Sequence, residues 1–346
     1  MLLYILKRLA LMIPTLFGII LITFVIIQFV PGGPVEQLVH QIQGKGGGEV
    51  SSGLYRGHTG LDPQRIQSLK ALYGFDKPVH VRFFEMVKRF LVFDLGESYY
   101  HHKSVWQLVK SKLPVSISLG LWTFVLTYLI CIPLGIKKAI RDGSKFDVAS
   151  TVAILIGYAI PGFVLAIALI VLLAGGTFWQ VFPLRNLVSD GWTNFPWYKK
   201  VFDYLWHMVL PIVSMTLGSL AVMTMLTKNT FLDEIKKQYV LTARAKGLPE
   251  NRVLYKHVFR NAMIPIITGF PAAFVGAFFA GSLLIETIFS LDGLGLLSFE
   301  SIQKRDYPVV MGTLYLFTLL GLITKLVTDL SYTLVDRRIR FGSVER

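Results

Sequence analysis

Charged side chains and cysteine are both scarce in this chain of 346 residues. Only 16% of the residues are charged, while 53% are hydrophobic; soluble domains carry about 25% charged residues. The deficit is concentrated in long apolar runs, which predicts a membrane protein with several spans. The single cysteine, Cys131, lies inside one of these runs. This excludes a disulfide framework and a metal site built from cysteines.

Motifs typical of hydrolases, NTPases and metalloenzymes are also missing. The sequence contains no G-x-x-x-x-G-K-[ST], no H-E-x-x-H and no G-x-S-x-G. The glycine run at Gly44–Gly48 follows no strand and has the spacing of a flexible loop. The adjacent His101 and His102 point in different directions on any regular element, so we interpret them as surface residues. We therefore expect no catalytic site, no metal site and no cofactor bound by this chain.

Six runs are long and apolar enough to cross a bilayer, which needs roughly 20 residues. They are Leu9–Val30, Val115–Ile136, Val148–Leu173, Met208–Leu226, Met263–Ile285 and Val309–Val335. The first five contain no charged residue, and the sixth carries Lys325 and Asp329 near one end. Carriers driven by ion gradients usually place titratable groups deep in their spans. Their scarcity here favours an energy source outside the chain.

The basic residues predict the orientation. They gather before the first span, between spans two and three, between spans four and five, and after span six. With six crossings, all four segments lie on one side, and that side is the cytoplasm. Both termini are then cytoplasmic. The same distribution explains the net charge of +14 without any nucleic-acid partner.

The region after the first span is too long for a simple loop. A stretch rich in glycine and serine, Gly44–Gly60, precedes a predicted helix over residues 62–73 and an amphipathic segment from Val79 to Phe93. This region can be a helical cap on the bundle or membrane interface, a docking platform for an outer partner, or both. We predict three regions: residues 1–112 with the first span and this periplasmic part, a core at 113–335, and a tail at 336–346.

A basic segment, Tyr239–Pro265, lies between spans four and five. Gly247 predicts a helix stop, and Pro249 and Glu250 suit the first turn of a second helix. In that helix Arg252, Lys256 and Arg260 fall on one face, and Leu254 and Val258 on another. Such a helix can bind in the groove of a partner or lie on anionic lipid. Small residues allow close backbone approach and favour the partner: Ala243, Ala245 and Gly247.

The run T-A-R-A-K-G-L from Thr242 to Leu248, followed by H-V-F-R-N-A from His257 to Ala262, resembles the EAA loop of ABC importer permeases, specifically the dipeptide, oligopeptide and nickel branch. Further matching motifs are L-K-R-L (Leu6–Leu9), D-L-G-E-S (Asp94–Ser98), I-P-G-F (Ile160–Phe163), H-M-V-L-P (His207–Pro211), E-T-I-F (Glu286–Phe289), R-D-Y-P (Arg305–Pro308) and D-R-R-I-R (Asp336–Arg340). The long Gly/Ser-rich stretch is more similar to permeases of oligopeptide/microcin C importers. One departure is that Leu241, Thr242 and Ala243 stand where the general pattern has Glu-Ala-Ala.

The resemblance implies an all-α, six-helix type I permease in the bacterial inner membrane, importing peptides or peptide-like antibiotics such as microcin C. The partners would be a second permease, ABC ATPase subunits that bind the ATP, and a periplasmic peptide-binding protein. The coupling loop spans residues 230–262, with the ATPase contacts at Thr242, Ala243, Ala245, Gly247, Leu248, Pro249, Arg252 and Lys256.

Polar residues of spans four and five are candidates for the substrate path: Thr216, Ser219, Thr224, Ser282 and Glu286. The four hydroxyl residues can equally be helix-packing residues. Glu286 can face the path, or can be an interfacial carboxylate bound to water or a backbone amide. The alternative function is a gradient-driven secondary transporter or channel for small solutes, and the missing motifs disfavour a membrane enzyme.

Overall fold

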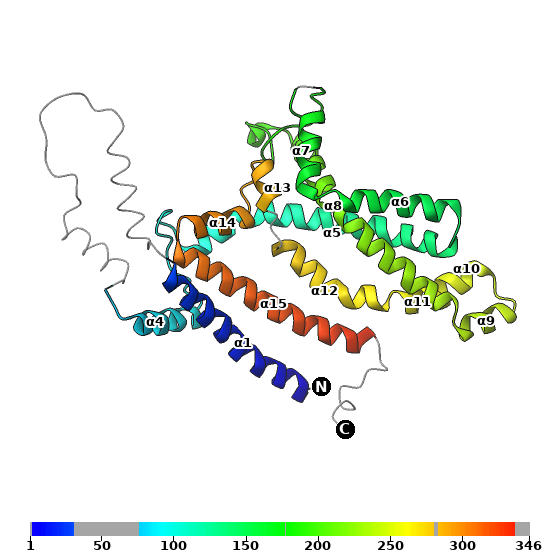
Figure 1. Cartoon of the computed structure of the whole chain (residues 1–346), viewed down its shortest axis with the longest axis horizontal. Helices are drawn as coiled ribbons and strands as arrows, with labels where there is room; N and C mark the ends of the chain where they lie inside the picture. The colour runs from blue at the N-terminus through cyan, green and yellow to red at the C-terminus, as the bar shows by residue number, and fades with distance from the viewer. Residues whose placement is uncertain (1, 31–75, 177, 280–282, 336–346) are drawn as a thin grey trace, which may run out of the picture. The chain divides into compact units, whose positions relative to one another are not determined.

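The computed structural model describes residues 2–30, 76–176, 178–279 and 283–335 (Figure 1). Every regular element in these ranges is a helix, and the strand-like pairing found there is one isolated bridge between Glu97 and Ser104. The predicted all-α fold is confirmed. The expected helix over residues 62–73 and the Gly44–Gly60 stretch lie outside the described residues.

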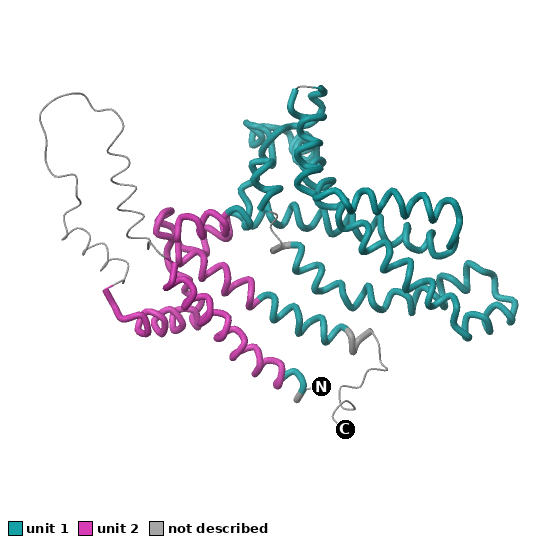
Figure 2. Tube along the Cα trace, viewed as in Figure 1, with its two compact units in different colours: residues 1–5, 112–296, 320–346 teal, residues 6–111, 297–319 magenta. Residues whose placement is uncertain are grey.

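The chain divides into two compact units, coloured separately in Figure 2. Unit 1 comprises residues 1–5, 112–296 and 320–346, and unit 2 comprises residues 6–111 and 297–319. The predicted boundary after residue 112 falls inside the long helix α5 (Val105–Ile140).

Four helices are long and apolar enough to cross a membrane. They are α1 (Leu2–Phe29), α5, α8 (Trp197–Ile235) and α15 (Tyr307–Val335). Two bent helix pairs pass the same test, so the described part of the chain holds four spans, or up to six if each bent pair is one span. A multi-pass membrane protein is therefore confirmed, and six crossings stay a prediction.

The predicted third span, Val148–Leu173, is not a single straight helix. It forms α6 (Lys145–Ala159) and α7 (Gly162–Leu173), which meet at an angle of 92°. The break falls at Ile160, which is extended (φ −85°, ψ 117°), and Pro161 precedes the first turn of α7. A residue before proline is sterically driven out of the helical region, and proline cannot donate a helical hydrogen bond.

Two of the spans begin ten residues or more before the apolar runs that predicted them. Helix α5 starts ten residues before Val115, and α8 starts eleven residues before Met208. These added turns contain charged and aromatic residues, and hydropathy alone places them in a connection. Pro196 precedes the first helical residue of α8, and this is a position where the missing N–H of proline costs nothing.

Two clusters of buried side chains hold unit 1 together. One joins α5, α7, α8 and α13 (Leu283–Ile288), and its largest members include Leu119, Met208 and Phe289. The other gathers around the basic segment between α8 and α12 (Ile264–Phe279). This second cluster connects the basic segment to α5, α8 and α12.

In unit 2 the predicted amphipathic segment is the helix α4 (Val79–Leu91), as expected. Its buried face carries Phe83, whose ring centre lies 5.2 Å from that of Phe24 in α1, and Phe90, 4.9 Å from Tyr315 in α15. Phe84 on its other face is exposed. Helix α4 is therefore anchored on two neighbouring helices of the unit along one side only.

Two motifs far apart in the sequence meet in unit 2. The Ser98 hydroxyl donates to the carboxylate of Asp306, and the Tyr99 backbone N–H donates to the same carboxylate at 3.1 Å. Asp306 is almost fully buried just before α15, and this burial raises the pKa of its carboxyl group while the hydrogen bonds oppose the rise. The D-L-G-E-S and R-D-Y-P motifs thus form one hydrogen-bonded junction.

Candidate functional site: the basic segment between α8 and α12

The basic segment forms a compact helical hairpin at one end of unit 1. Helix α9 (Gln238–Ala245) leads through a turn into α10 (Glu250–Arg252), the π-helix η2 (Val253–Val258) and α11 (Phe259–Ala262). Figure 1 shows α9, α10 and α11 together at the far end of α8. The last three elements are continuous and bend by 50° into α12. The hairpin therefore lies between two candidate spans and is connected directly to both.

Gly247 closes α9 as its sequence predicts. Its φ is +77°, the left-handed conformation that only glycine adopts without strain. The Gly247 N–H donates to the Arg244 carbonyl at 2.9 Å, and the Leu248 N–H donates to the Ala243 carbonyl at 3.4 Å. These two bonds form a Schellman motif, which satisfies carbonyls at the end of a helix.

The turn is closed from outside by an ion pair. The Arg244 guanidinium contacts both carboxylate oxygens of Glu250, at 2.5 and 3.1 Å. Pro249 is the residue before the first turn of α10 rather than its first residue, so Glu250 begins the helix. The pair is largely exposed, so it contributes at most about 1 kcal/mol, and its main effect is to limit the shapes available to the turn.

The hairpin is bound to the long helices by a core that we call the coupling cluster. It contains buried residues of the hairpin and of the neighbouring helices: Ala139, Phe231, Val240, Ala243, Val253, Leu254, Val258, Ala262, Met263 and Ile266. Ala139 belongs to α5, Phe231 to α8 and Ile266 to α12. Packed cores transmit displacement because they have few voids and low compressibility. The coupling cluster therefore joins the hairpin to α5, α8 and α12.

The two predicted faces of the second helix are present. Leu254 and Val258 are buried in the coupling cluster, while Arg252, Lys256 and Arg260 are exposed. The sequence did not predict that residues 253–258 form a π-helix, a type often found at functional positions.

A polar link ties the hairpin to the end of α8. The Tyr239 hydroxyl lies 2.5 Å from a Glu234 carboxylate oxygen and accepts a hydrogen bond from the Asn261 side chain at 3.0 Å. Glu234 belongs to α8, Tyr239 to α9 and Asn261 to α11. One hydroxyl therefore connects three helices. Nothing in the sequence pattern marks this link, because its members belong to separate helices.

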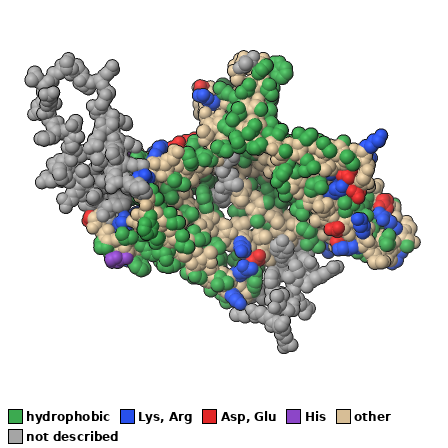
Figure 3. Space-filling model, in the orientation of Figure 1, with side chains coloured by type: hydrophobic (Ala, Val, Ile, Leu, Met, Phe, Trp, Pro, Cys, Tyr) green, Lys and Arg blue, Asp and Glu red, His purple; other side chains and the backbone are tan. Residues whose placement is uncertain are grey.

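The predicted ATPase contacts divide by exposure. Thr242, Ala245, Gly247, Pro249, Arg252 and Lys256 are exposed, Leu248 is half-buried and Ala243 is buried. Basic and acidic side chains gather at this end of unit 1, whereas the flanks of the helices behind it are mainly apolar (Figure 3). Ala243 packs into the coupling cluster and supports the surface from within. Two exposed apolar side chains that sequence reasoning passed over, Leu241 and Tyr255, lie among the basic ones.

The described candidates for a substrate path lie mostly in contacts between helices. On α8, Thr216 and Thr224 are buried and Ser219 is half-buried, while Ser282 lies outside the described residues. A Cβ added to Gly135 of α5 would come within 2.9 Å of the Thr224 carbonyl oxygen. Thr224 therefore lies at a close crossing of α5 and α8. This position fits the packing alternative, in which small residues allow helices to approach closely.

Glu286 of α13 is fully buried, and its carboxylate accepts a hydrogen bond from the Leu296 N–H at 2.7 Å. Leu296 lies in the first turn of α14 (Leu294–Gln303), where N–H groups lack helical partners. A Cβ on Gly293 would come 2.5 Å from the Glu286 carboxyl carbon. The arrangement matches the backbone-amide alternative for Glu286, and it explains why glycine is needed at residue 293.

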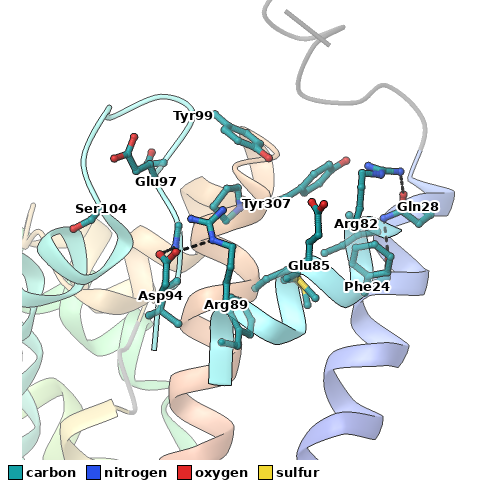
Figure 4. A pocket seen from close by; sticks show the side chains of 18 of the residues that line it. Phe24, Gln28, Arg82, Glu85, Arg89, Asp94, Glu97, Tyr99, Ser104 and Tyr307 are labelled. Carbon is teal, nitrogen blue, oxygen red and sulfur yellow. Dashed lines mark hydrogen bonds and ion pairs between the residues drawn. The ribbon is translucent and has the colours of Figure 1, made fainter. Parts of the chain in front are cut away.

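Unit 2 contains a cavity of about 720 Å³ between α1, α4 and the start of α15 (Figure 4). Its lining carries charges of both signs. Arg82 donates to the Gln28 side chain at 2.9 Å, Arg89 forms an ion pair with Asp94 at 2.8 Å, and Glu85 also lines the cavity. The hydrogen bond from Arg89 lowers the pKa of Asp94. These nearly balanced charges give no preference for an anionic or a cationic ligand.

The fold defines a multi-pass α-helical membrane protein with a structured basic hairpin between two spans. Residues 131–341 match the family described as the binding-protein-dependent transport system inner membrane component. The chain belongs to this family of transport permeases. Membership implies an inner-membrane location and work with a binding protein and an ABC ATPase.

Curated relatives match almost the full length. The chain is 54% identical to the peptidoglycan transport system permease protein YejB of Agrobacterium fabrum and 53% identical to the inner membrane ABC transporter permease protein YejB of Escherichia coli O157:H7. Each alignment covers 98% of both chains. The chain is also 33% identical to the dipeptide transport system permease protein DppB of Escherichia coli K12, over 98% of this chain and 99% of the relative. The resemblance to peptide permeases is confirmed.

Proposed function

We propose that this chain is a permease subunit of an ATP-driven importer of peptides, including oligopeptides and peptide-like compounds such as microcin C or peptidoglycan fragments. The relatives named for peptidoglycan and dipeptide transport support this substrate class. The observation that carries the mechanism is the coupling cluster, because it connects an exposed basic hairpin to α5, α8 and α12 through a continuous core.

In this proposal the ATPase binds the exposed surface around Gly247. Arg252 and Lys256 supply polar contacts, while Thr242, Ala245 and Pro249 allow close approach at the turn. Leu248 and Ala243 hold the turn on the coupling cluster. Leu241 and Tyr255 add apolar anchors, since exposed aromatic and aliphatic groups amid charges are typical of binding surfaces. ATP is bound by the partner, and this chain needs no cofactor.

Closure of the ATPase subunits would displace the hairpin, and the coupling cluster would pass that motion to the spanning helices. A second permease subunit completes the pathway, and a peptide-binding protein delivers substrate from the periplasm. The basic segments, including the tail after α15, then face the cytoplasm together with both termini. Such transmission needs an element that the partner binds at one site and a helix bundle that can pack in two alternative arrangements.

The path itself is proposed to follow α8 and the α12–α13 region, with Thr216 and Ser219 as its weak polar candidates. Glu286 and Thr224 act as packing residues in this proposal. The alternative of a gradient-driven carrier has less support, because the family match is to binding-protein-dependent systems and the runs are nearly free of titratable groups.

Reconstitution tests the proposal. The chain is placed in liposomes with its partner permease, ATPase subunits and binding protein, and uptake of a labelled oligopeptide is measured with ATP and with a non-hydrolysable analogue. We expect uptake only with ATP and only with the ATPase present. Peptide accumulation by the chain alone under a proton gradient would refute the proposal and support the carrier.

A further inference from the structure

Four charged side chains form an ionic cluster where α5, α6 and α8 meet in unit 1. The Lys228 ammonium of α8 lies 2.6 Å from one Asp147 carboxylate oxygen and 2.8 Å from the Asp142 carboxylate. The Lys138 ammonium of α5 lies 3.0 Å from the other Asp147 oxygen. Two cations therefore face two anions, and Asp147, in the first turn of α6, lies between the two lysines.

The centre of this cluster is buried and closely hydrogen-bonded. Lys138 is fully buried and Asp147 is only 4% exposed. Lys138 also donates to the Asp147 carbonyl at 2.8 Å and to the hydroxyls of Ser150 and Thr151 at 2.8 and 2.6 Å. A buried ammonium group is stable only when its donors are matched in this way.

Hydrogen bonds within the local sequence orient the Asp147 side chain independently of the two lysines. Ser144 caps α6 by accepting a hydrogen bond from the Asp147 N–H, and the Asp147 carboxylate accepts one from the Gly143 N–H at 3.1 Å. This reciprocal arrangement resembles a capping box. The aspartate is thus fixed in direction, and the positions of Lys138 and Lys228 fix α5 and α8 around it.

The cluster is a poor device for stability alone. Replacing a buried ion pair with well-packed apolar residues is often neutral or stabilising, whereas an ion pair demands one defined geometry. Asp147 contacts lysines from two helices through different oxygens. Its specific effect is therefore to hold three helix ends in one relative position.

The ionic cluster adjoins the coupling cluster along both long helices. Ala139, which follows Lys138 in α5, packs in the coupling cluster. Phe231, three residues after Lys228 in α8, packs there too. Helix α6 has no residue in that core and reaches it only through α5 and α8. The ions thus attach α6, and the α7 that follows it, to the two helices that the hairpin moves.

We propose that Asp147 and Lys228 are positioning residues for transport, which clamp α6 to α5 and α8 so that hairpin displacement moves the three helices as one body. This inference rests on the proposed function. Without this clamp, ATP hydrolysis proceeds, but less of the hairpin displacement reaches α6 and α7. The consequence is a fall in peptide transported per ATP hydrolysed, separate from any loss of folded protein.

The test uses the full transporter in liposomes, with peptide uptake and phosphate release measured in the same sample. The variants are Asp147→Asn and the paired Asp147→Asn/Lys228→Met. In the paired variant the Lys138 ammonium keeps its hydrogen bonds to the backbone carbonyl of residue 147 and to the hydroxyls of Ser150 and Thr151. Lys145→Met is the matched control, since Lys145 is an exposed cation two residues from Asp147 at the same helix end. Assembled complex is quantified by size-exclusion chromatography, and both rates are expressed per complex.

We expect peptide transported per ATP to fall by about twofold to thirtyfold in both variants, the range over which mutations alter coupling, and to stay unchanged in Lys145→Met. An unchanged ratio per assembled complex would overturn the clamp. If Asp147→Asn does not assemble, Lys228→Met tests the same clamp, because it removes the α8 contact while Asp147 keeps its ion pair with Lys138 at 3.0 Å. A wild-type complex without ATP-dependent uptake would instead refute the proposed function.

Discussion

Replacing Gly247 with aspartate should abolish ATP-driven uptake while leaving the chain inserted and folded. Gly247 has a φ of +77°, and a Cβ built there meets no atom of the chain within 4 Å. The substitution therefore causes backbone strain but no internal clash. A side chain in the left-handed region costs up to about 1–2 kcal/mol. This is small beside the typical free energy of unfolding, about 5–15 kcal/mol.

The effect on uptake has a different origin. Gly247 is exposed at the tip of the hairpin, in the middle of the proposed ATPase contacts. An aspartate there places a charged side chain in a surface that we propose the partner approaches at backbone distance. Binding surfaces tolerate buried, unpaired charge badly, at a cost of several kcal/mol. That cost falls on the complex and not on the isolated chain.

Gly191 offers a matched control. Its φ is +75°, a Cβ there also meets no atom within 4 Å, and it lies far from the hairpin in the sequence. Gly191→Asp should have the same internal strain and keep normal uptake. The assay is labelled-peptide uptake in reconstituted liposomes, with membrane-inserted protein and ATPase co-purification measured in parallel. Normal uptake by Gly247→Asp, or equal loss in both variants, would refute the reasoning.

Two further variants test the internal links. Tyr239→Phe removes the hydroxyl between Glu234 and α11, so we expect the free energy of unfolding in detergent to fall by about 1 kcal/mol or slightly more, with no fall for the exposed Tyr255→Phe. Gly293→Ala forces a methyl group against Glu286 and should lower the free energy of unfolding by about 1–3 kcal/mol, measured by thermal denaturation. Gly269→Ala, where the space is open, is its control and should show no loss.

Sequence reasoning succeeded where the cause is local. Apolar length predicted the spanning helices, the periodicity of residues 79–93 predicted α4, and Gly247 predicted the end of α9. Each of these depends on residues within a few turns of one another. The separation of Arg252 from Leu254 on opposite faces also follows from local spacing, and it survives the change from an α-helix to a π-helix.

Other features of the helices could not be predicted from the sequence. The bend at Ile160 depends on a proline that the sequence displays, yet several other prolines lie inside helices without breaking them. Whether such a position kinks or continues depends on the packing around it. Hydropathy also placed the starts of α5 and α8 too late, because their first turns carry charged and aromatic side chains that lower the local hydropathy.

By itself, the sequence determined the class of the protein, since long apolar runs require helices in a bilayer, where every backbone polar group must be satisfied within its own segment. It also placed the basic hairpin between two spans. Only the tertiary structure decided what the hairpin is attached to. Lys228 and Asp147 are 81 residues apart, and Ser98 and Asp306 are 208 apart. Contacts over such separations depend on the packing of whole helices, which no local pattern encodes.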